Sequence, residues 1–314
     1  MTGTPHIALP KPRPVSRRGL TIAAVVLLGF FLLYALVVRA YQVEGELSTT
    51  QEQIAQAVDV EVTVEPFDFD ARTNVLTARL RFVVVNPVLT DSGGRLNEGI
   101  RVTVSGADGS EEFRFAEGEP VGNAEVQVGT SGEIYAYPFD THEAFMALSV
   151  ETFEREAGGI NQTTGELTSS IDVQGAISGW DIKADLSSLG NFPLADLTLK
   201  RAFSTQAFAI VLILMAISVV VLALIASLMT VTNRRKFEVA LLTWNGAILF
   251  ALPLLRTYLP GSPPIGAAMD IYLYLWTFVL AVSSLVLMVV AWSEQRKAEI
   301  IIEHEQLHGA RHGA

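Results

Sequence analysis

The sequence of 314 residues contains no cysteine. Disulfide bonds, a thiol nucleophile and a Cys-ligated metal site are therefore excluded. Charged residues are also scarce, at 18% of the chain, whereas hydrophobic residues make up 50%. Because soluble domains average about 25% charged residues, this balance indicates a membrane protein.

Basic residues are few in the middle of the chain, where residues 42–200 hold 27 acidic and 9 basic side chains. A surface with this excess repels anionic polymers, so we expect no nucleic-acid partner. Carboxylates crowd near Asp68 and near Glu112, but neither group has the spacing of a calcium-binding loop. We expect neither a metal site nor a cofactor.

Apolar runs long enough to cross a hydrocarbon core of ~30 Å occur four times. They predict transmembrane helices at residues 20–38, 202–232, 238–258 and 271–292. The first follows a Pro-rich, basic segment, residues 1–19, which we expect to be disordered and cytoplasmic. This first run exceeds the ~7–15 apolar residues of a cleaved signal peptide, which favours an uncleaved signal anchor. Cleavage after Ala40 is the alternative, because Val38-Arg39-Ala40 resembles a cleavage site.

Residues 42–201 carry a different pattern, in which hydrophobic and polar residues alternate, as in Val58–Glu65 and Leu76–Phe82. This two-residue period is typical of half-buried strands. Turn clusters such as Asp91-Ser92-Gly93-Gly94 separate the strand candidates. The segment therefore predicts a short stalk and an antiparallel β-sandwich, which makes the chain an α+β membrane protein. Further strands are expected at residues 100–104, 112–115, 124–128, 145–150, 167–173 and 176–183.

Basic residues beside the predicted helices set the topology. Asn233-Arg234-Arg235-Lys236 lies between the second and third helices, and Arg296 and Lys297 follow the fourth. The positive-inside rule places both segments, and the tail at residues 293–314, in the cytoplasm. The β-sandwich and the Pro/Gly-rich loop at residues 259–270 are then extracytoplasmic. We expect a multi-pass protein of the plasma membrane with both termini in the cytoplasm.

The predicted spans have no ionisable residue near their centres. Proton-coupled transport generally needs ionisable residues there to relay protons, so the sequence argues against this function. Asn245 and Pro253 are the polar and helix-kinking residues of the third predicted span. An intramembrane Asn is a candidate functional group, but an interhelical hydrogen bond is its more common role. Small residues mark positions where helices can approach closely: Ala209, Ala216, Ala223, Ala247 and Ala251.

One sequence pattern is enzymatic. His304-Glu305-Gln306-Leu307-His308 matches the H-E-x-x-H motif of zinc proteases. It lies in the polar tail, where no following domain supplies a substrate cleft. A solvated tail helix is the better interpretation, and we expect the protein not to be an enzyme.

The Pro/Gly-rich loop and its flanking segments resemble a known family. The residues are Phe250-Ala251-Leu252-Pro253-Leu254-Leu255-Arg256, Leu259-Pro260-Gly261-Ser262-Pro263-Pro264-Ile265-Gly266, Asp270 and Trp276, with Tyr137-Pro138-Phe139-Asp140 in the β region. They are similar to the bacterial, largely actinobacterial, membrane-protein family DUF4436, and the resemblance extends from Leu20 to Trp292. It implies a membrane location and the order of anchor, β domain and three helices, but no activity.

The loop and the Tyr137–Asp140 turn supply most of the candidate interface residues. Prolines stiffen the loop and its glycines permit turns that other residues cannot make, so we expect it to brace the β domain. The turn is expected to face this loop, with Arg256 opposite its carboxylate; an ordinary strand-ending turn is the alternative. The candidate structural and interface residues are Tyr137, Pro138, Asp140, Asn245, Pro253, Arg256, Pro260, Gly261, Pro263, Pro264, Gly266, Asp270 and Trp276.

Two functions remain. The favoured one is a non-enzymatic cell-envelope protein, anchored in the lipid bilayer, whose outer β-sandwich binds or organises an envelope partner or a second copy of the chain. The alternative is a subunit of a channel or transporter, since the layout is similar to that of pentameric ligand-gated channels. Against the alternative stand the additional N-terminal anchor, three rather than four helices after the β domain, and the missing Cys loop. Ser218, Ser227 and Thr230 supply only a thin polar stripe for a pore.

Overall fold

A computed structural model describes residues 48–51, 58–155 and 161–312, together with isolated helical positions between residues 21 and 39. Its side chains are described for residues 58–154 and 163–297 and for those isolated positions. The chain divides into two compact units, Met1–Val43 and Glu44–Ala314. The predicted disordered N-terminus lies outside the described residues, as do 9 of the 19 residues of the predicted first span.

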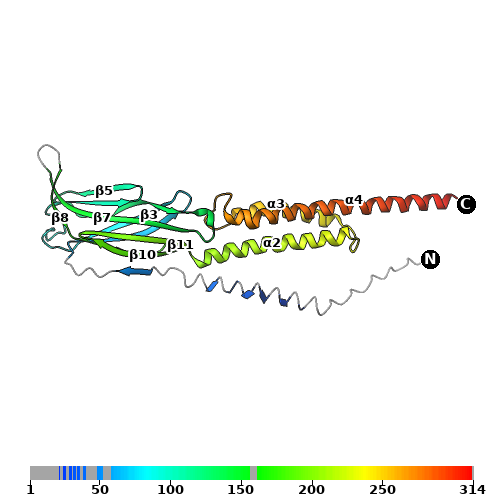
Figure 1. Ribbon diagram of the computed structural model, residues 1–314, viewed down its shortest axis with the longest axis horizontal. Coiled ribbons are helices and arrows are strands. Elements are labelled where there is room, and N and C mark those ends of the chain that lie inside the picture. The colour runs from blue at the N-terminus through cyan, green and yellow to red at the C-terminus, as the bar shows by residue number, and fades with distance from the viewer. Residues whose placement is uncertain are drawn as a thin grey trace, which may run out of the picture. The chain divides into compact units, whose positions relative to one another are not determined.

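Strands fill the first part of the second unit, as predicted from the alternating pattern (Figure 1). They are β1 (Ser48–Gln51), β2 (Val60–Asp70), β3 (Val75–Val84), β4 (Gly99–Gly106), β5 (Gly109–Phe115), β6 (Ala124–Gly132), β7 (Thr141–Arg155), β8 (Asn161–Leu167), β9 (Ser169–Val173), β10 (Trp180–Leu189) and β11 (Phe192–Arg201). A short 3₁₀ turn, η1 (Ile134–Ala136), precedes β7. We call this part the β domain.

Hydrogen bonds join the strands in the order β1-β10-β11-β7-β6-β3-β2-β9; in addition, β4 and β8 pair with β7, and β5 pairs with β4. Most pairs are antiparallel, as predicted. Two pairs differ, because β1 runs parallel to β10 and β9 runs parallel to β2. Parallel neighbours need a long connection rather than a hairpin, and both pairs join strands that are far apart in the sequence. The sandwich packing of two separate sheets stays a prediction.

The alternation of the strands builds one hydrophobic core. In β3, Leu76, Ala78 and Leu80 are buried, and the residues between them are more exposed. The same core includes buried residues of β4, β7, β10 and β11. It draws only on residues of the β domain, so this domain does not need the helices to complete it.

Several strands differ from the sequence prediction: β1, β8 and β11 were not predicted, and β10 begins later than predicted. β11 is absent from the predicted strands, although Ala195, Leu197 and Leu199 are buried at alternate positions. β10 begins at Trp180 instead of residue 176, because Gly175 and Gly179 adopt φ values of +107° and +82°, which interrupt an extended strand.

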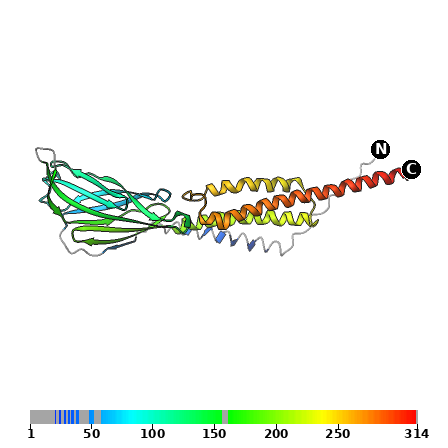
Figure 2. The same ribbon diagram turned by 45° about the horizontal axis from the view of Figure 1, so that its top comes forward.

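Three helices follow, and each is long and apolar enough to span a membrane. They are α2 (Phe203–Val231), α3 (Val239–Thr257) and α4 (Leu275–His312), the last preceded by a π-helical turn, η2 (Asp270–Tyr274). Their candidate spans have mean hydropathies of 3.3, 1.6 and 2.3. Figure 2 shows the three helices side by side, with α4 packed against α2 and α3. The fold is therefore an α+β fold in which a β domain precedes three potential membrane helices.

The predicted small-residue positions divide between two environments. Ala209, Ala216 and Ala223 are buried along α2, where the other helices approach. Ala247 and Ala251 are exposed on α3, so this second pair does not mark a helix contact within the chain. The period of α3 places Asn245, Ile248 and Leu252 on the buried face instead.

Candidate functional site: the junction of the β domain and the helices

The β domain passes into the helices without a linker. Arg201 is the last residue of β11, Ala202 is the N-cap and Phe203 begins α2. Arg201 is held in register opposite Trp180 of β10. Because the strand is paired up to its last residue, the position of Arg201 relative to the β domain is fixed by backbone hydrogen bonds.

Arg201 forms a buried ion pair with Asp140, the residue that precedes β7. Its Nε lies 2.6 Å from Asp140 Oδ1, and the second carboxylate oxygen lies 3.2 Å from His142 Nε2. The exposed fractions of Asp140, His142 and Arg201 are 1%, 0% and 3%. A buried charge is costly unless it is paired, so each member of this group depends on the others.

Two aromatic rings enclose the guanidinium of Arg201. Its Cζ lies 4.5 Å from the ring centroid of Trp180 and 4.6 Å from that of Tyr137. Both distances are within the range of cation–π attraction, which is stronger where water is excluded. We call Tyr137, Asp140, His142, Trp180 and Arg201 the junction cluster.

The environment shifts two acidic groups of the junction cluster in opposite directions. Burial by itself raises the pKa of Asp140, but the hydrogen bonds from His142 and Arg201 outweigh it, and the pKa falls below its usual 3.8. Burial raises the pKa of the Tyr137 hydroxyl to about 12. At neutral pH, Asp140 is therefore ionised and Tyr137 is neutral.

Three polar atoms of the junction cluster lack a hydrogen-bond partner among the described residues. They are Tyr137 Oη, His142 Nδ1 and Arg201 Nη2. Buried polar atoms without a partner are uncommon in native proteins. The cluster thus holds more hydrogen-bonding capacity than its own side chains use.

The Pro/Gly-rich loop lies directly against the junction cluster. Gly261 has a φ of +71°, and a Cβ atom at this position would lie 2.6 Å from Arg201 Nη1. Beside it, Tyr137 is buried in a small hydrophobic group, with Leu259 and Met269 from the loop and Ile213 from α2. The predicted turn and loop are therefore brought together. The turn contacts the loop through the ring of Tyr137, whereas the carboxylate of Asp140 pairs with Arg201.

The structure corrects the predicted role of Arg256. This residue does not pair with Asp140; its Nη2 lies 2.7 Å from Asp270 Oδ2 and donates to the carbonyl oxygens of Pro263 and Pro264, at 3.1 and 3.0 Å. The backbone N–H of Gly266 also donates to Asp270 Oδ2, at 2.9 Å. Arg256 thus folds the loop, while Arg201 holds the turn.

The remaining candidate residues occupy other places. Pro138 follows Tyr137 through a cis peptide bond and is buried, whereas Pro260 is partly buried at the loop. Pro253 is exposed within α3. Trp276 is 64% exposed in the first turn of α4, where an aromatic ring suits a membrane interface.

Asn245 belongs to a separate polar contact inside the helices. Its Oδ1 accepts a hydrogen bond from Ser284 Oγ at 2.6 Å, and Ser284 Oγ lies 2.9 Å from Ser227 Oγ. One side chain each from α2, α3 and α4 meets here, and all are buried. This arrangement is the interhelical hydrogen bond expected for an intramembrane Asn.

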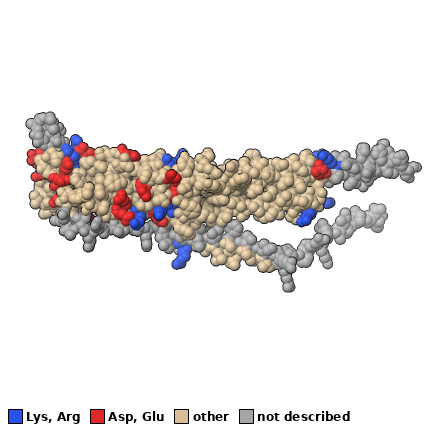
Figure 3. Space-filling model, viewed as in Figure 1, with Lys and Arg blue, Asp and Glu red and all other residues tan. Residues whose placement is uncertain are grey.

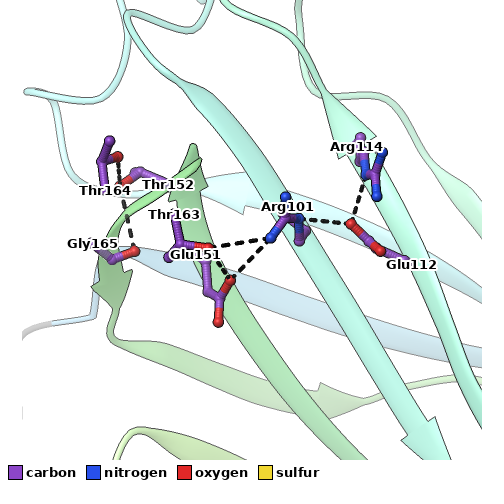
Figure 4. A network of polar contacts seen from close by, with 8 residues as sticks. All are labelled: Arg101, Glu112, Arg114, Glu151, Thr152, Thr163, Thr164 and Gly165. Carbon is purple, nitrogen blue, oxygen red and sulfur yellow. Dashed lines mark hydrogen bonds and ion pairs between the residues drawn. The ribbon is translucent and has the colours of Figure 1, made fainter. Parts of the chain in front are cut away.

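Glu112 is engaged by two arginines on the surface of the β domain (Figure 4). Arg101 Nε and Arg114 Nε each lie 2.6 Å from Glu112 Oε1, and Arg101 also approaches Glu151 at 3.5 Å. Among the residues that the structure describes, no three His, Asp or Glu side chains gather as metal ligands would. The H-E-x-x-H residues lie outside the part with described side chains.

Sequence reasoning identified the loop and the turn but missed Arg201, His142 and Trp180. The sequence pattern could have identified His142 as buried, because it shares the buried alternate positions of β7 with Ala144, Met146 and Leu148. Arg201 had a weaker one, since it is the basic residue directly before the longest apolar run. No local pattern pairs it with Asp140.

Two family comparisons divide the chain at this junction. Residues 49–199 match the family described as Domain of unknown function (DUF4436), and residues 201–295 match the family described as Domain of unknown function (DUF8686). The resemblance of the β domain is thus confirmed, but the Pro/Gly-rich loop belongs to the second match. A comparison with curated proteins gives no match. The ion pair between Asp140 and Arg201 therefore joins one matched region to the other.

Proposed function

With residues 49–199 belonging to the DUF4436 family, we propose that this protein is a non-enzymatic membrane protein of the cell envelope that holds its β domain in a fixed orientation for a partner. The junction cluster is the observation that carries this proposal. A partner-binding domain on a flexible tether needs no buried contact with its anchor, whereas here the Gly261 loop lies against Arg201, and Tyr137 packs with Ile213, Leu259 and Met269 of the helical part.

The burial of the cluster supports a structural role over a catalytic one. Asp140, His142 and Arg201 are the kind of side chains that catalyse proton transfer, but they are at most 3% exposed. A catalytic acid or base must come within hydrogen-bond reach of its substrate. These side chains instead bind each other at the junction of the β domain and the helices.

The proposed setting is a bacterial plasma membrane. Residues 20–38 form a fourth span, both termini lie in the cytoplasm and the β domain, folded as a β-sandwich, lies outside. The basic residues at Arg234–Lys236 and Arg296 support this orientation. Reporter fusions after Ala314 and within the loop at residues 259–270 test it, because activity of an extracytoplasmic reporter at Ala314 would overturn it.

Rigidity is tested by measuring a distance across the junction. The absence of cysteine allows two spin labels to be introduced without removing native thiols. Lys183→Cys on β10 and Leu254→Cys on α3 place both labels at exposed positions. Double electron–electron resonance in detergent should give one narrow distance distribution, which Arg201→Gln should broaden. A broad distribution in the otherwise unaltered protein contradicts the proposal.

Partner binding is tested by photo-crosslinking in cells. Exposed β-domain positions, such as Val83, Val85 and Phe67, receive a photoreactive amino acid one at a time, and Leu222 on α2 serves as the lipid-facing control. We expect one recurrent product from adjacent β-domain positions and a different pattern from the control. Identical products from every position would show random collision instead of a partner surface.

The channel alternative gains no support from the polar stripe of α2. Ser218 and Thr230 donate to backbone carbonyls of their own helix, and Ser227 contacts Ser284. Their hydroxyl groups are thus used within one chain. Single-particle determination of the oligomeric state tests the alternative, since a closed ring around a helix-lined axis would favour a channel.

A further inference from the structure

A polar hollow of about 750 Å³ lies where α2 leads into α3, beside the end of the apolar part of α4. Arg235, Lys236 and Phe237 line it from the turn between α2 and α3, and Trp292 and Arg296 line it from α4. None of these residues belongs to the junction cluster or to the proposed partner surface of the β domain.

Gln295 of α4 holds the turn in place. Its Oε1 accepts a hydrogen bond from the backbone N–H of Phe237 at 2.7 Å, and its Nε2 donates to the carbonyl oxygens of Thr230 and Arg235 at 3.1 and 3.3 Å. The turn is therefore fastened to α4, and cationic residues from both segments line the same hollow.

The charge around the hollow is predominantly positive. Arg234, Arg235, Lys236, Arg296 and Lys297 outnumber the two carboxylates of Glu238 and Glu294. Figure 3 shows Lys and Arg at this end of the helices, beside an uncharged helix surface. Glu294 Oε1 forms an ion pair with Lys297 Nζ at 3.1 Å. Glu238 Oε1 lies 3.9 Å from Arg235 Nη2 in a second exposed pair. Within residues 163–297, Lys236 and Arg296 have no ion-pair partner.

The hollow also has an apolar side. Trp292 is 39% exposed at the end of the apolar run of α4, and its ring lies 5.6 Å from Arg296 Cζ. Val239, at the start of α3, is 69% exposed and lines the same hollow. A group that fills the hollow thus meets cations and an aromatic ring where the lipid-facing surface begins.

We propose that this hollow binds the headgroup of an anionic phospholipid. The lipid phosphate lies against Arg235, Lys236 and Arg296, and its acyl chains continue along Trp292 and Val239. Basic pockets between membrane helices recognise anionic headgroups in this way, and interfacial Trp suits the boundary between headgroup and acyl chain. A free phosphate ion would use the cations but leave the apolar side unfilled. The inference requires that the three helices span a bilayer and is independent of any β-domain partner.

Native mass spectrometry of the full-length protein in a mild detergent tests the proposal. The protein is titrated with phosphatidylglycerol, with phosphatidylcholine and with inorganic phosphate. We expect phosphatidylglycerol to bind at least about tenfold more tightly than phosphatidylcholine, and inorganic phosphate not to compete with it. Equal binding of both lipids overturns the proposal, and so does displacement by inorganic phosphate, which would indicate a simple anion site.

Charge removal sharpens the test. Arg235→Gln with Lys236→Gln should weaken phosphatidylglycerol binding about 25-fold, at about fivefold for each cation. Lys183→Gln with Lys200→Gln removes the same charge from the β domain and should leave binding unchanged. An equal loss in both double variants would overturn the proposal.

A salt titration of the unaltered protein covers the case in which the first variant fails to fold. Rising salt should weaken the binding of phosphatidylglycerol, because salt screens exposed charges. Binding that is insensitive to salt would contradict recognition by these cations.

Discussion

The junction cluster and the interior of the helices are both held by buried polar side chains, but they differ in charge. At the junction, Arg201 and Asp140 carry full opposite charges. Inside the helices, Ser227, Asn245 and Ser284 are neutral and are joined by two hydrogen bonds. A neutral contact in an apolar environment contributes modestly, whereas a buried ion pair becomes strongly destabilising when one partner is removed. The junction is therefore the more vulnerable of the two.

Removal of Arg201 should have the largest effect. Arg201→Ala leaves the Asp140 carboxylate buried without its main partner, so we expect a loss of about 3–5 kcal/mol in the free energy of unfolding. Urea unfolding of the full-length protein in detergent, followed by the β signal in circular dichroism, measures this loss.

The matched control replaces both charges with apolar groups of similar size. Arg201→Met combined with Asp140→Leu should regain part of the stability, since no unpaired charge remains. If the double variant is as unstable as Arg201→Ala, shape rather than charge dominates the junction.

A smaller effect is expected from Asp140→Asn, and it should depend on pH. At neutral pH, the loss of the charged hydrogen bonds should cost about 2–3 kcal/mol. The pKa of Asp140 is lowered in the folded protein, so its stabilisation is full above 3.8 and declines as the pH falls through the folded value. The stability difference between the variant and the unaltered protein should therefore shrink below pH 3.8. A difference that stays constant to strongly acidic pH would show that ionisation of Asp140 does not stabilise the fold.

Gly261→Ala should destabilise the junction by about 2 kcal/mol, because the added Cβ meets Arg201 Nη1 and the positive φ disfavours alanine. Gly246→Ala in α3 is the control, since a Cβ there meets nothing within 4 Å and alanine favours a helix. Melting temperatures of both variants should change in opposite directions. A drop of similar size in both would assign no special role to the loop contact.

The smallest effect is expected inside the helices. Ser284→Ala removes the hydroxyl between Asn245 and Ser227 and should cost about 1 kcal/mol. Ser283→Ala is its neighbour control, because Ser283 donates only to the carbonyl of Val279 on its own helix. A loss for Ser284→Ala that matches the loss for Arg201→Ala would remove the distinction between the two regions.

The fold was largely predictable because period and length are local signals. Alternation in Leu76–Phe82 marks β3, and the uninterrupted apolar run after Ala202 marks α2. The junction was only half predictable. Proline and glycine spacing identified the loop, but the partner of Asp140 depends on the pairing of β11 with β7, which brings residues 61 positions apart into contact. Arg256 was the predicted partner of Asp140 because it carries the opposite charge beside the loop. Its ion pair with Asp270 is visible only in the three-dimensional structure.

The contact between Gly261 and Arg201 has a consequence for the biosynthesis of the protein. Chains are made from the N-terminus, and domains fold as units during synthesis. The β domain and Arg201 are complete before α3 and the Gly261 loop leave the ribosome. The guanidinium of Arg201 can therefore bind Asp140 but stays uncovered on the loop side until α3 and the loop have been synthesised. The loop that joins α3 to α4 would then cover Arg201 only after these two helices have folded correctly.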